Sequence, residues 1–532
     1  MDTAAILNRP PKPLLFFFFL FFSLHCITTH SFPATSLPSS HNIDCWCRSV
    51  PHPEPCRLYL SHPNSTVHRR SDFFKISVKA ALNLAVHAQA RTRRLGSRCS
   101  SEAEKTAWLD CWKLFGNTVL QLNRTLFFSV NNSNAVDAQT WLSAALTNLY
   151  TCNKGFTELK ANSSFMQPVF SYRVSDLISN CLAINSASFN GTVELPRWGW
   201  EGGRRLLQAS GRADFVVAKD GSGNFGTIKA ALDAAAALRR SSSRRIVVHV
   251  KIGVYAEYLQ IASSLRDLTI TGDGKGKTII TGRRSVALGY TTFSSATISV
   301  FGDRFVATDI TIRNTYGAGS QGVALLSGSD QSVFYRCSIE GYQDTLCVYT
   351  QRQFYRQCDI YGTIDFIFGN AAVVIQNSNI VARKPLKGEA NVITAQGRTD
   401  QNQNTGIVIQ SSKILAAPDL KPVHRQVKSY LGRPWQLYSR TVYMENYIDS
   451  IIDRAGWIPF NGNFALDTLF YAEFQNNGPG AKVLRFRVKW KGVHIIRRPS
   501  QVTQFTVGNF IAGGTWLPAT GVPFDSGLSS GK

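Results

Sequence analysis

Acidic residues are scarce in this chain of 532 residues. It carries 34 Asp and Glu against 58 Lys and Arg, so its formal net charge is +24. A basic excess of this size favours an anionic partner: a nucleic acid, a membrane surface or an acidic polysaccharide. The secretory features described next make a nucleic acid the weakest of these three, and we expect none as a partner.

Long apolar runs are scarce as well. The early run Leu14–Phe22 follows the basic residues Arg9 and Lys12. It is shorter than the ~20 residues that a membrane-spanning helix needs. A basic start before a short apolar run is typical of a secretory signal peptide. We therefore predict a signal peptide over residues 1–30 and no stable membrane association after its removal. An uncleaved anchor is the alternative.

Cysteine is rare in the second half of the chain. Of 11 cysteines, seven lie between Cys45 and Cys181, and only Cys337, Cys347 and Cys358 come later. An oxidising compartment permits disulfides in the first part. No group of His, Cys and carboxylate residues has metal-ligand spacing, so the sequence suggests neither a metal nor another cofactor.

Acceptor triplets for N-glycosylation fit a secreted chain. All of them precede Arg204, which suggests a glycosylated N-terminal part. The five acceptors are Asn64, Asn123, Asn131, Asn162 and Asn190.

The first part of the chain has helical periodicity. Apolar residues recur at three-to-four spacing in Asp137–Tyr150 and Val174–Ile184. Phe73–Ala90 is rich in Ala, Leu and Val with few helix breakers, and Ser101–Phe115 begins with residues that suit a helix start. We assign a helical domain to residues 42–190. Residues 191–211 lose this periodicity and form a linker. Its basic run, Arg204, Arg205, Leu206 and Leu207, is either a processing site or an ordinary basic loop.

Residues 212–532 have the texture of an all-β domain. Short runs of Val, Ile, Thr and Phe alternate with Gly, Asn and Asp. Thr227–Arg240 is an exception, an Ala-rich helix suited to capping the first coil of a solenoid. The expected strands are Arg245–Val250, Leu268–Thr271, Thr278–Thr281, Thr297–Val300, Ala307–Arg313, Ala371–Ile375, Gly406–Ile409 and Thr441–Met444.

A short internal repeat refines this prediction. FYRCSIEGYQD ends at Asp344 and FYRQCDIYGTID ends at Asp365, an offset of 21 residues that also aligns Cys337 with Cys358. A repeat of this length suits one coil of a right-handed parallel β-helix. Adjacent parallel strands lie ~4.8 Å apart, so Asp344 and Asp365 should lie side by side. Two carboxyls at so short a distance do not ionise independently, because the charge of one raises the pKa of the other. The repeat therefore predicts a protonated carboxyl, which can act as an acid, beside an ionised one, which can act as a nucleophile or base. The aligned cysteines either pair across coils or remain small buried residues.

Several longer motifs identify a family. They are Gly253–Glu257, Gln321–Leu325, Gly341–Leu346, Gly362–Gly369 and Leu431–Trp435. Over roughly the last 320 residues the chain closely resembles plant pectin methylesterases. Trp141–Thr147 with Cys152 resembles the family's inhibitor-like pro-region, and the basic run at 204–207 resembles its processing motif.

The resemblance implies roles for the two aspartates. Asp365 would attack the methyl-ester carbonyl of a galacturonate unit and form an acyl-enzyme. Asp344 would protonate the departing methanol and then act as base on the hydrolytic water. Arg433 would hold Asp365 ionised and aimed through its planar fork.

The resemblance also assigns supporting residues. Gln321 and Gln343 would stabilise the oxyanion as uncharged donors. Trp435 would stack on a sugar ring, and Gln321 and Arg433 would also contact substrate. Weaker aromatic candidates for the cleft are Tyr342, Tyr349, Phe366 and Trp457.

The cysteines include family-like pairs and departures from the family. Cys47–Cys56 and Cys111–Cys152 are the pairs that the resemblance implies in the pro-region, and Cys337–Cys358 is a weaker candidate. Cys347 and Tyr349 stand where many members have Tyr and His. Ser378 and Ser412 stand where a disulfide is common.

The implied protein is a secreted cell-wall enzyme that acts on methyl-esterified pectin. Its pro-region would inhibit or chaperone the enzyme until a subtilisin-like protease cleaves the linker, and separate inhibitor proteins are further possible partners. A β-helix lyase or glycosidase is one alternative. A non-catalytic pectin-binding wall protein is the other.

Overall fold

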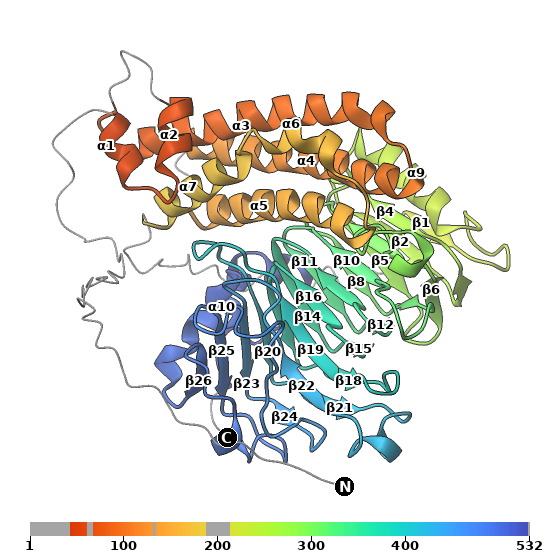
Figure 1. The fold of residues 1–532 in the computed structure, drawn as a ribbon. Helices are drawn as coiled ribbons and strands as arrows, with labels where there is room; N and C mark the ends of the chain where they lie inside the picture. The colour runs from red at the N-terminus through yellow and green to blue at the C-terminus, as the bar shows by residue number, and fades with distance from the viewer. Residues whose placement is uncertain (1–42, 61–66, 131–134, 188–212, 530–532) are drawn as a thin grey trace, which may run out of the picture. The chain divides into compact units, whose positions relative to one another are not determined.

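The computed structural model describes residues 43–60, 67–130, 135–187 and 213–529 (Figure 1). The predicted signal peptide, the processing run at 204–207 and the acceptors Asn64, Asn131 and Asn190 lie outside these residues.

The first part is helical, as predicted. Its long helices α3, α4 and α5 run side by side (Figure 1). In α5 every residue from Ala138 to Asn148 is buried. A helix at the surface of a domain buries only one stripe, so this stretch has neighbours on all sides. The helices are α1 Ile43–Arg48, α2 Pro53–Leu60, α3 Arg70–Leu95, α4 Glu102–Val130, α5 Ala135–Glu158, α6 Gln167–Phe170 and α7 Val174–Ser186.

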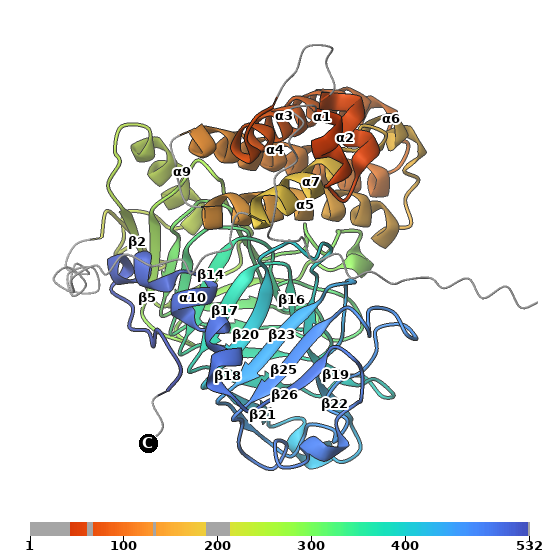
Figure 2. The ribbon, with the colours of Figure 1, turned by 90° about the vertical axis from the view of Figure 1, so that its left-hand side faces the viewer.

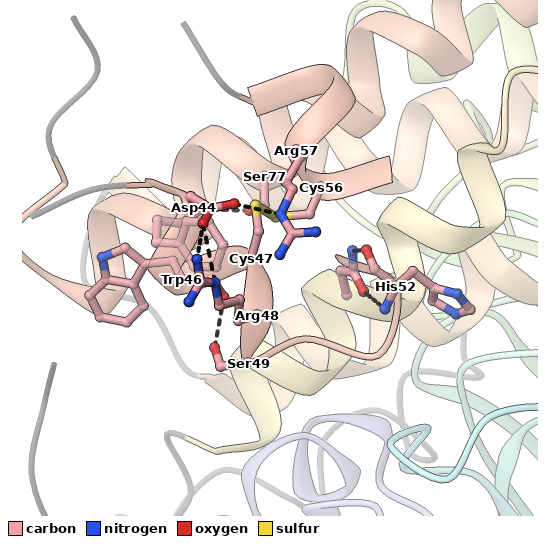
Figure 3. Close-up of a disulfide and its surroundings, with 11 residues drawn as sticks. Asp44, Trp46, Cys47, Arg48, Ser49, His52, Cys56, Arg57 and Ser77 are labelled. Carbon is pink, nitrogen blue, oxygen red and sulfur yellow. Dashed lines mark hydrogen bonds and ion pairs between the residues drawn. A yellow bond between two sulfur atoms is a disulfide. The ribbon is translucent and has the colours of Figure 1, made fainter. Parts of the chain in front are cut away.

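Two disulfides fasten this helical domain. Cys47–Cys56 joins α1 to α2 beside Asp44, which accepts hydrogen bonds from Arg48 and Arg57 (Figure 3). Cys111–Cys152 joins α4 to α5. Both pairs implied by the family resemblance are therefore present.

The weaker prediction of a Cys337–Cys358 disulfide is wrong. Both residues are free and fully buried. The Cys358 thiol donates to the Phe334 carbonyl at 3.3 Å, and the Cys337 thiol donates to the Ala307 carbonyl at 3.5 Å. Each thiol thus donates its hydrogen bond to a backbone carbonyl of an earlier coil, and each cysteine is a small residue of the core.

The second part is a parallel β-helix, which confirms the predicted fold class. Every strand pair between neighbouring coils is parallel, and the strands form three sheets that run along the solenoid (Figures 1 and 2). The eleven-stranded sheet consists of β1 Phe215–Val217, β2 Ile246–Val250, β5 Leu268–Gly272, β8 Val306–Thr308, β11 Ser332–Tyr335, β14 Arg352–Arg356, β17 Ala372–Gln376, β20 Gly406–Gln410, β23 Arg440–Met444, β25 Phe470–Phe474 and β26 Val493–Ile496.

The other two sheets complete each coil. The eight-stranded sheet consists of β3 Gly253–Tyr255, β6 Thr278–Gly282, β9 Thr311–Asn314, β12 Ser338–Glu340, β15 Asp359–Gly362, β18 Asn379–Ala382, β21 Lys413–Ala416 and β24 Tyr447–Ile448. The seven-stranded sheet consists of β4 Leu259–Ile261, β7 Ile298–Val300, β10 Leu325–Ser327, β13 Leu346–Val348, β16 Ile367–Gly369, β19 Asn391–Gln396 and β22 Ser429–Gly432.

A left-handed residue separates the first and second strands of many coils. Asp309 (φ 59°) stands between β8 and β9, and Arg336 (φ 52°) and Gln357 (φ 54°) hold the same place in the next two coils. The single strand expected at Ala307–Arg313 is therefore two strands, because a residue in this conformation turns the chain out of a sheet.

A ladder of isoleucines fills the interior. Paired positions on successive coils place these side chains one above the next, and all are buried. Fully burying one such side chain contributes about 1.5–3 kcal/mol, so the stack is a major stabilising element. Its members are Ile280, Ile312, Ile339, Ile360, Ile380, Ile414 and Ile448.

A helix covers the first coil, as predicted. In α9 (Ile228–Arg239), the Thr227 side chain accepts from the Ala230 N–H as N-cap. Ile228, Ala231 and Ala235 turn into the solenoid core. Near the other end, the short helix α10 (Val507–Phe510) joins an apolar cluster on the eleven-stranded sheet. None of the helices described is long and apolar enough to cross a membrane.

Candidate active site

Asp344 and Asp365 occupy equivalent turns on adjacent coils. Asp344 lies between β12 and β13, and Asp365 lies between β15 and β16. The flanking strands pair in register, and the Asp344 N–H donates to the Ile364 carbonyl at 3.0 Å. Both aspartates have left-handed backbone, with φ of 60° and 50°. The repeat therefore puts the two carboxyls on neighbouring turns.

Arg433 holds Asp365 through a two-pronged ion pair. Its Nε donates to Oδ1 at 2.8 Å and its Nη2 donates to Oδ2 at 2.7 Å. The side chains are 25% and 12% exposed, so the pair is shielded from most solvent. Arg433 follows β22, and its backbone N–H donates to the Thr394 carbonyl. This hydrogen bond fixes the backbone position from which the Arg433 side chain extends. A bidentate pair of this kind fixes orientation as well as charge.

The two carboxyls have different electrostatic surroundings. Burial, the charge of Asp365 and that of Glu158 raise the pKa of Asp344 well above its ordinary value. Burial raises the pKa of Asp365 too, but the charge and hydrogen bonds of Arg433 oppose this. Asp365 is therefore the carboxyl that ionises first, and Asp344 is the one that keeps its proton.

Gln321 and Gln343 line the same cavity as the aspartates. The N–H of Gly322 donates to the carbonyl of Gln343 at 3.1 Å, which joins their two coils side by side. Their amide groups offer donors without adding a charge.

Trp435 also lines the cavity, two residues beyond Arg433. Its ring centroid lies 6.0 Å from that of Phe368, edge to face. A Cβ at Gly397 would come within 2.6 Å of the Trp435 ring, so only glycine lets the ring approach the backbone there.

Of the four weaker aromatic candidates, one lines the cavity and three do not. Tyr349 lines the cavity. Tyr342 instead accepts a hydrogen bond from Arg383, Phe366 is fully buried, and Trp457 is buried against Tyr471. These three do not line the cavity. Phe366 and Trp457 belong to the solenoid core.

Sequence reasoning missed Phe460, which lines the cavity with its centroid 4.9 Å from the Arg433 guanidinium carbon. It is 39% exposed. No repeat or motif points to it. Phe368 was also missed, although it lies inside the motif Gly362–Gly369.

The helical domain forms the other wall of the cavity, which has a volume of about 190 Å³. Thr147, Tyr150, Lys154 and Glu158 of α5 all line it. Asn370 donates to the Thr147 hydroxyl at 2.8 Å. Tyr150 accepts a hydrogen bond from Gln436, and its ring meets the Trp435 ring at 6.0 Å. In the full chain, α5 therefore occupies the open side of the cleft.

Two carboxyls of the helical domain, buried Asp110 and half-buried Glu158, bind a loop of the β-helix. The Thr291 hydroxyl donates to Asp110, and the Thr292 N–H donates to Glu158 at 2.9 Å. Burial raises the pKa of Asp110 to about 6, although the hydrogen bond from Thr291 opposes this. Burial also raises the pKa of Glu158.

Ion pairs fasten the two domains further along α5. Arg352 of the β-helix is only 4% exposed and contacts Asp330 on its own domain and Asp137 on α5, each at 2.7 Å. Arg124 of α4 contacts Asp303 at 2.9 Å. The Tyr349 hydroxyl donates to Asn148 at 3.0 Å. The interface between the helical domain and the β-helix therefore includes many contacts that do not involve the linker. Within the described ranges, no three His, Cys, Asp or Glu side chains are grouped to hold a metal ion.

Known proteins resemble both parts. The pectinesterase family model matches residues 214–514, and that of plant invertase/pectin methylesterase inhibitors matches 41–184. Pectinesterase 2 of Citrus sinensis is 53% identical over 92% of this chain and 96% of its own length. Probable pectinesterase/pectinesterase inhibitor 17 of Arabidopsis thaliana is 53% identical over 92% and 94%.

Among solved structures, the pectin methylesterase from carrot matches 60% of this chain and 98% of its own. It does so at 52% identity with a TM-score of 0.58. The chain belongs to the pectinesterase family, whose members are carboxylic ester hydrolases, and carries an inhibitor-family domain before the esterase domain.

Proposed function

We propose that the β-helix hydrolyses methyl esters of homogalacturonan in the cell wall, releasing methanol and leaving free carboxylates. The observation that carries this proposal is the fork from Arg433 to Asp365, one coil from a second carboxyl, Asp344, that has no such fork. This arrangement supplies one ionised and one protonated carboxyl at the same place.

The first half-reaction forms an acyl-enzyme. An Asp365 oxygen attacks the ester carbonyl carbon, and the electron pair of the carbonyl moves to its oxygen. Gln321 and Gln343 donate hydrogen bonds to that oxyanion. When the carbonyl re-forms, the bond to the methoxy oxygen breaks, and Asp344 gives this oxygen its proton so that methanol leaves.

The second half-reaction restores the enzyme. Asp344, now ionised, accepts a proton from water as the water oxygen attacks the acyl carbon. The bond to the Asp365 oxygen then breaks, which leaves a free galacturonate carboxyl and an ionised Asp365.

Methanol release from methylated pectin tests these roles. Asp365→Asn and Asp344→Asn should each lower the rate by about a thousandfold or more, because each removes one chemical step. Asp359→Asn on the same coil, a residue paired with Lys275 at 2.7 Å, is the matched control. Unchanged release by Asp365→Asn would exclude this nucleophile. Pectin chains that shorten during the reaction would favour a lyase or glycosidase.

The helical domain is proposed to inhibit the enzyme until the linker is cut by a subtilisin-like protease. The support is α5, whose Tyr150 and Lys154 line the cleft that substrate would need. Comparing methanol release before and after cleavage near Leu207 tests this, and equal rates would contradict inhibition. Glycosylation of the helical domain fits the same secreted route, since Asn123 and Asn162 are both exposed.

A further inference from the structure

A strongly basic surface lies at the C-terminal end of the β-helix. Residues 482–498 contain no acidic residue. Six of their cations are exposed, and none of these six forms a salt bridge with any described residue. We call these the C-terminal basic surface: Lys482, Arg485, Lys489, Lys491, Arg497 and Arg498.

Some exposed cations elsewhere on the solenoid are paired, and others, such as Lys384 and Lys421, form no salt bridge with a described residue. Arg304 contacts Asp267 and Arg336 contacts Asp309, each at 2.6 Å, with the acid on another coil. In the last coils buried Arg487 holds Glu473 at 2.7 Å, and the nearby acids Asp449, Asp453 and Asp467 form no salt bridge with the six cations. The C-terminal basic surface therefore keeps a net positive charge that the fold does not use.

Apolar groups lie among these cations. Phe486 is 43% exposed, with the guanidinium carbons of Arg485 and Arg454 at 4.6 and 5.2 Å from its ring centroid. Trp490 is half-buried. Strand β26 is the last of the eleven-stranded sheet and pairs only with β25 in the described chain (Figure 2). Cations beside partly exposed aromatic side chains suit a ligand that carries both carboxylates and sugar rings.

One chain segment connects this surface to the catalytic cleft. Arg454 lies over Phe486 at the surface, and Phe460 lies over Arg433 in the cleft. Six residues of extended chain span at most about 21 Å. The two places are thus close enough for one polymer chain to reach both.

We propose that the C-terminal basic surface binds a run of free carboxylates on an acidic galacturonan, outside the cleft. The proposal rests on the proposed function for its biological ligand, because each hydrolysed ester adds one negative charge to the polymer. A partly hydrolysed chain would then be held at this surface while an esterified stretch of it enters the cleft. The site would act through charge, so its contribution should fall as salt screens it.

The test is binding of the full chain to long polygalacturonate, which has no ester and so does not depend on the esterase activity. The variant carries Lys489→Gln, Lys491→Gln, Arg497→Gln and Arg498→Gln. A control of equal charge carries Lys384→Gln, Lys387→Gln, Lys421→Gln and Arg425→Gln, four other exposed cations. We expect the first variant to lose about tenfold in affinity or more, and the control to lose much less.

Salt and ligand choice complete the experiment. At about 1 M salt the difference between wild type and the first variant should vanish, since screening then acts within ~3 Å. Neutral dextran should bind neither protein. Equal losses in both variants would overturn the proposal, because net charge alone would explain them. Tighter binding of the wild type to vesicles of phosphatidylserine than to polygalacturonate would overturn the assignment to a polysaccharide.

Discussion

The Arg433 guanidinium meets both oxygens of Asp365, at 2.8 and 2.7 Å, so one carboxyl of the neighbouring pair is neutralised and aimed while the other is not. The proposed division of labour follows from this asymmetry. The same asymmetry makes the pH dependence of the reaction sensitive to Arg433, although Arg433 forms no bond to the substrate carbon.

Arg433→Gln should shift the acid limb of the pH–rate profile. The nucleophile must be ionised, so activity falls as pH falls through the pKa of Asp365. Without the cation that opposes the effect of burial, this pKa rises, and the limb should move up by about one pH unit or more. Methanol release measured across pH checks this. Arg336→Gln, which breaks a surface pair with Asp309, should leave the limb in place.

Asp110 should make the attachment of the helical domain depend on pH. Its pKa is about 6 in the structure against 3.8 when free. Below about pH 4 the carboxyl is protonated in both states, and the stability is fully present. As pH rises through about 6 the buried group must ionise, and about 3 kcal/mol is lost.

Thermal unfolding of the helices, followed by circular dichroism of the full chain at several pH values, tests this. Asp110→Asn should flatten the decline between about pH 4 and 6, although Glu158 still titrates in the same direction. Asp233→Asn, an exposed carboxyl on α9, is the control. An identical decline in Asp110→Asn and wild type would contradict the assignment.

Tyr349 should help to hold α5. Tyr349→Phe leaves the side-chain amide oxygen of Asn148 without its 3.0 Å donor, which costs about 1–3 kcal/mol at a buried site. A double-mutant cycle with Asn148→Ala, measured by urea unfolding of the full chain, isolates the pair. The two changes should be clearly less than additive. Strict additivity would mean that this hydrogen bond contributes nothing. Tyr447→Phe, at an exposed tyrosine, reports the effect of losing a hydroxyl alone.

The Cys111–Cys152 disulfide should stabilise the helical domain. It closes a loop with a sequence separation of 41. Loop-closure entropy then predicts a loss of about 4 kcal/mol when both cysteines become alanine. Denaturant unfolding of the full chain should show the transition of the helices shifted and that of the β-helix largely retained. Cys45→Ala removes a free thiol of the same domain and is the control.

The sequence predicts most of the features that recur from coil to coil. The 21-residue offset between Asp344 and Asp365 reports directly on stacked coils, because parallel strands keep equivalent residues in register. Thr227–Arg240 reveals α9 because alanines favour helix and Thr227 is a good cap. The pattern at Ala307–Arg313 predicts one strand where the structure has two, since no pattern of apolar residues marks the left-handed Asp309.

Contacts between distant segments are harder to predict. Phe460 reaches Arg433 from a loop with no periodicity, and Tyr150 reaches Trp435 from another domain. The same limit applies to Ser378 and Ser412. The family resemblance implies that a disulfide is missing at these two positions, but it does not predict the hydrogen bonds found there. The Ser378 N–H donates to the Ser412 hydroxyl, and the Ser412 N–H donates to Asn446.

The left-handed backbone at Asp344 and Asp365 favours aspartate over glutamate at both positions, although Glu445 also adopts this conformation (φ 61°). Asp and Asn tolerate this conformation better than residues with longer or branched side chains. Glutamate would carry the conformational cost and would also move its carboxyl one methylene away from the Arg433 fork. Asparagine is therefore the informative exchange at both positions, since it changes the chemistry and spares the turn.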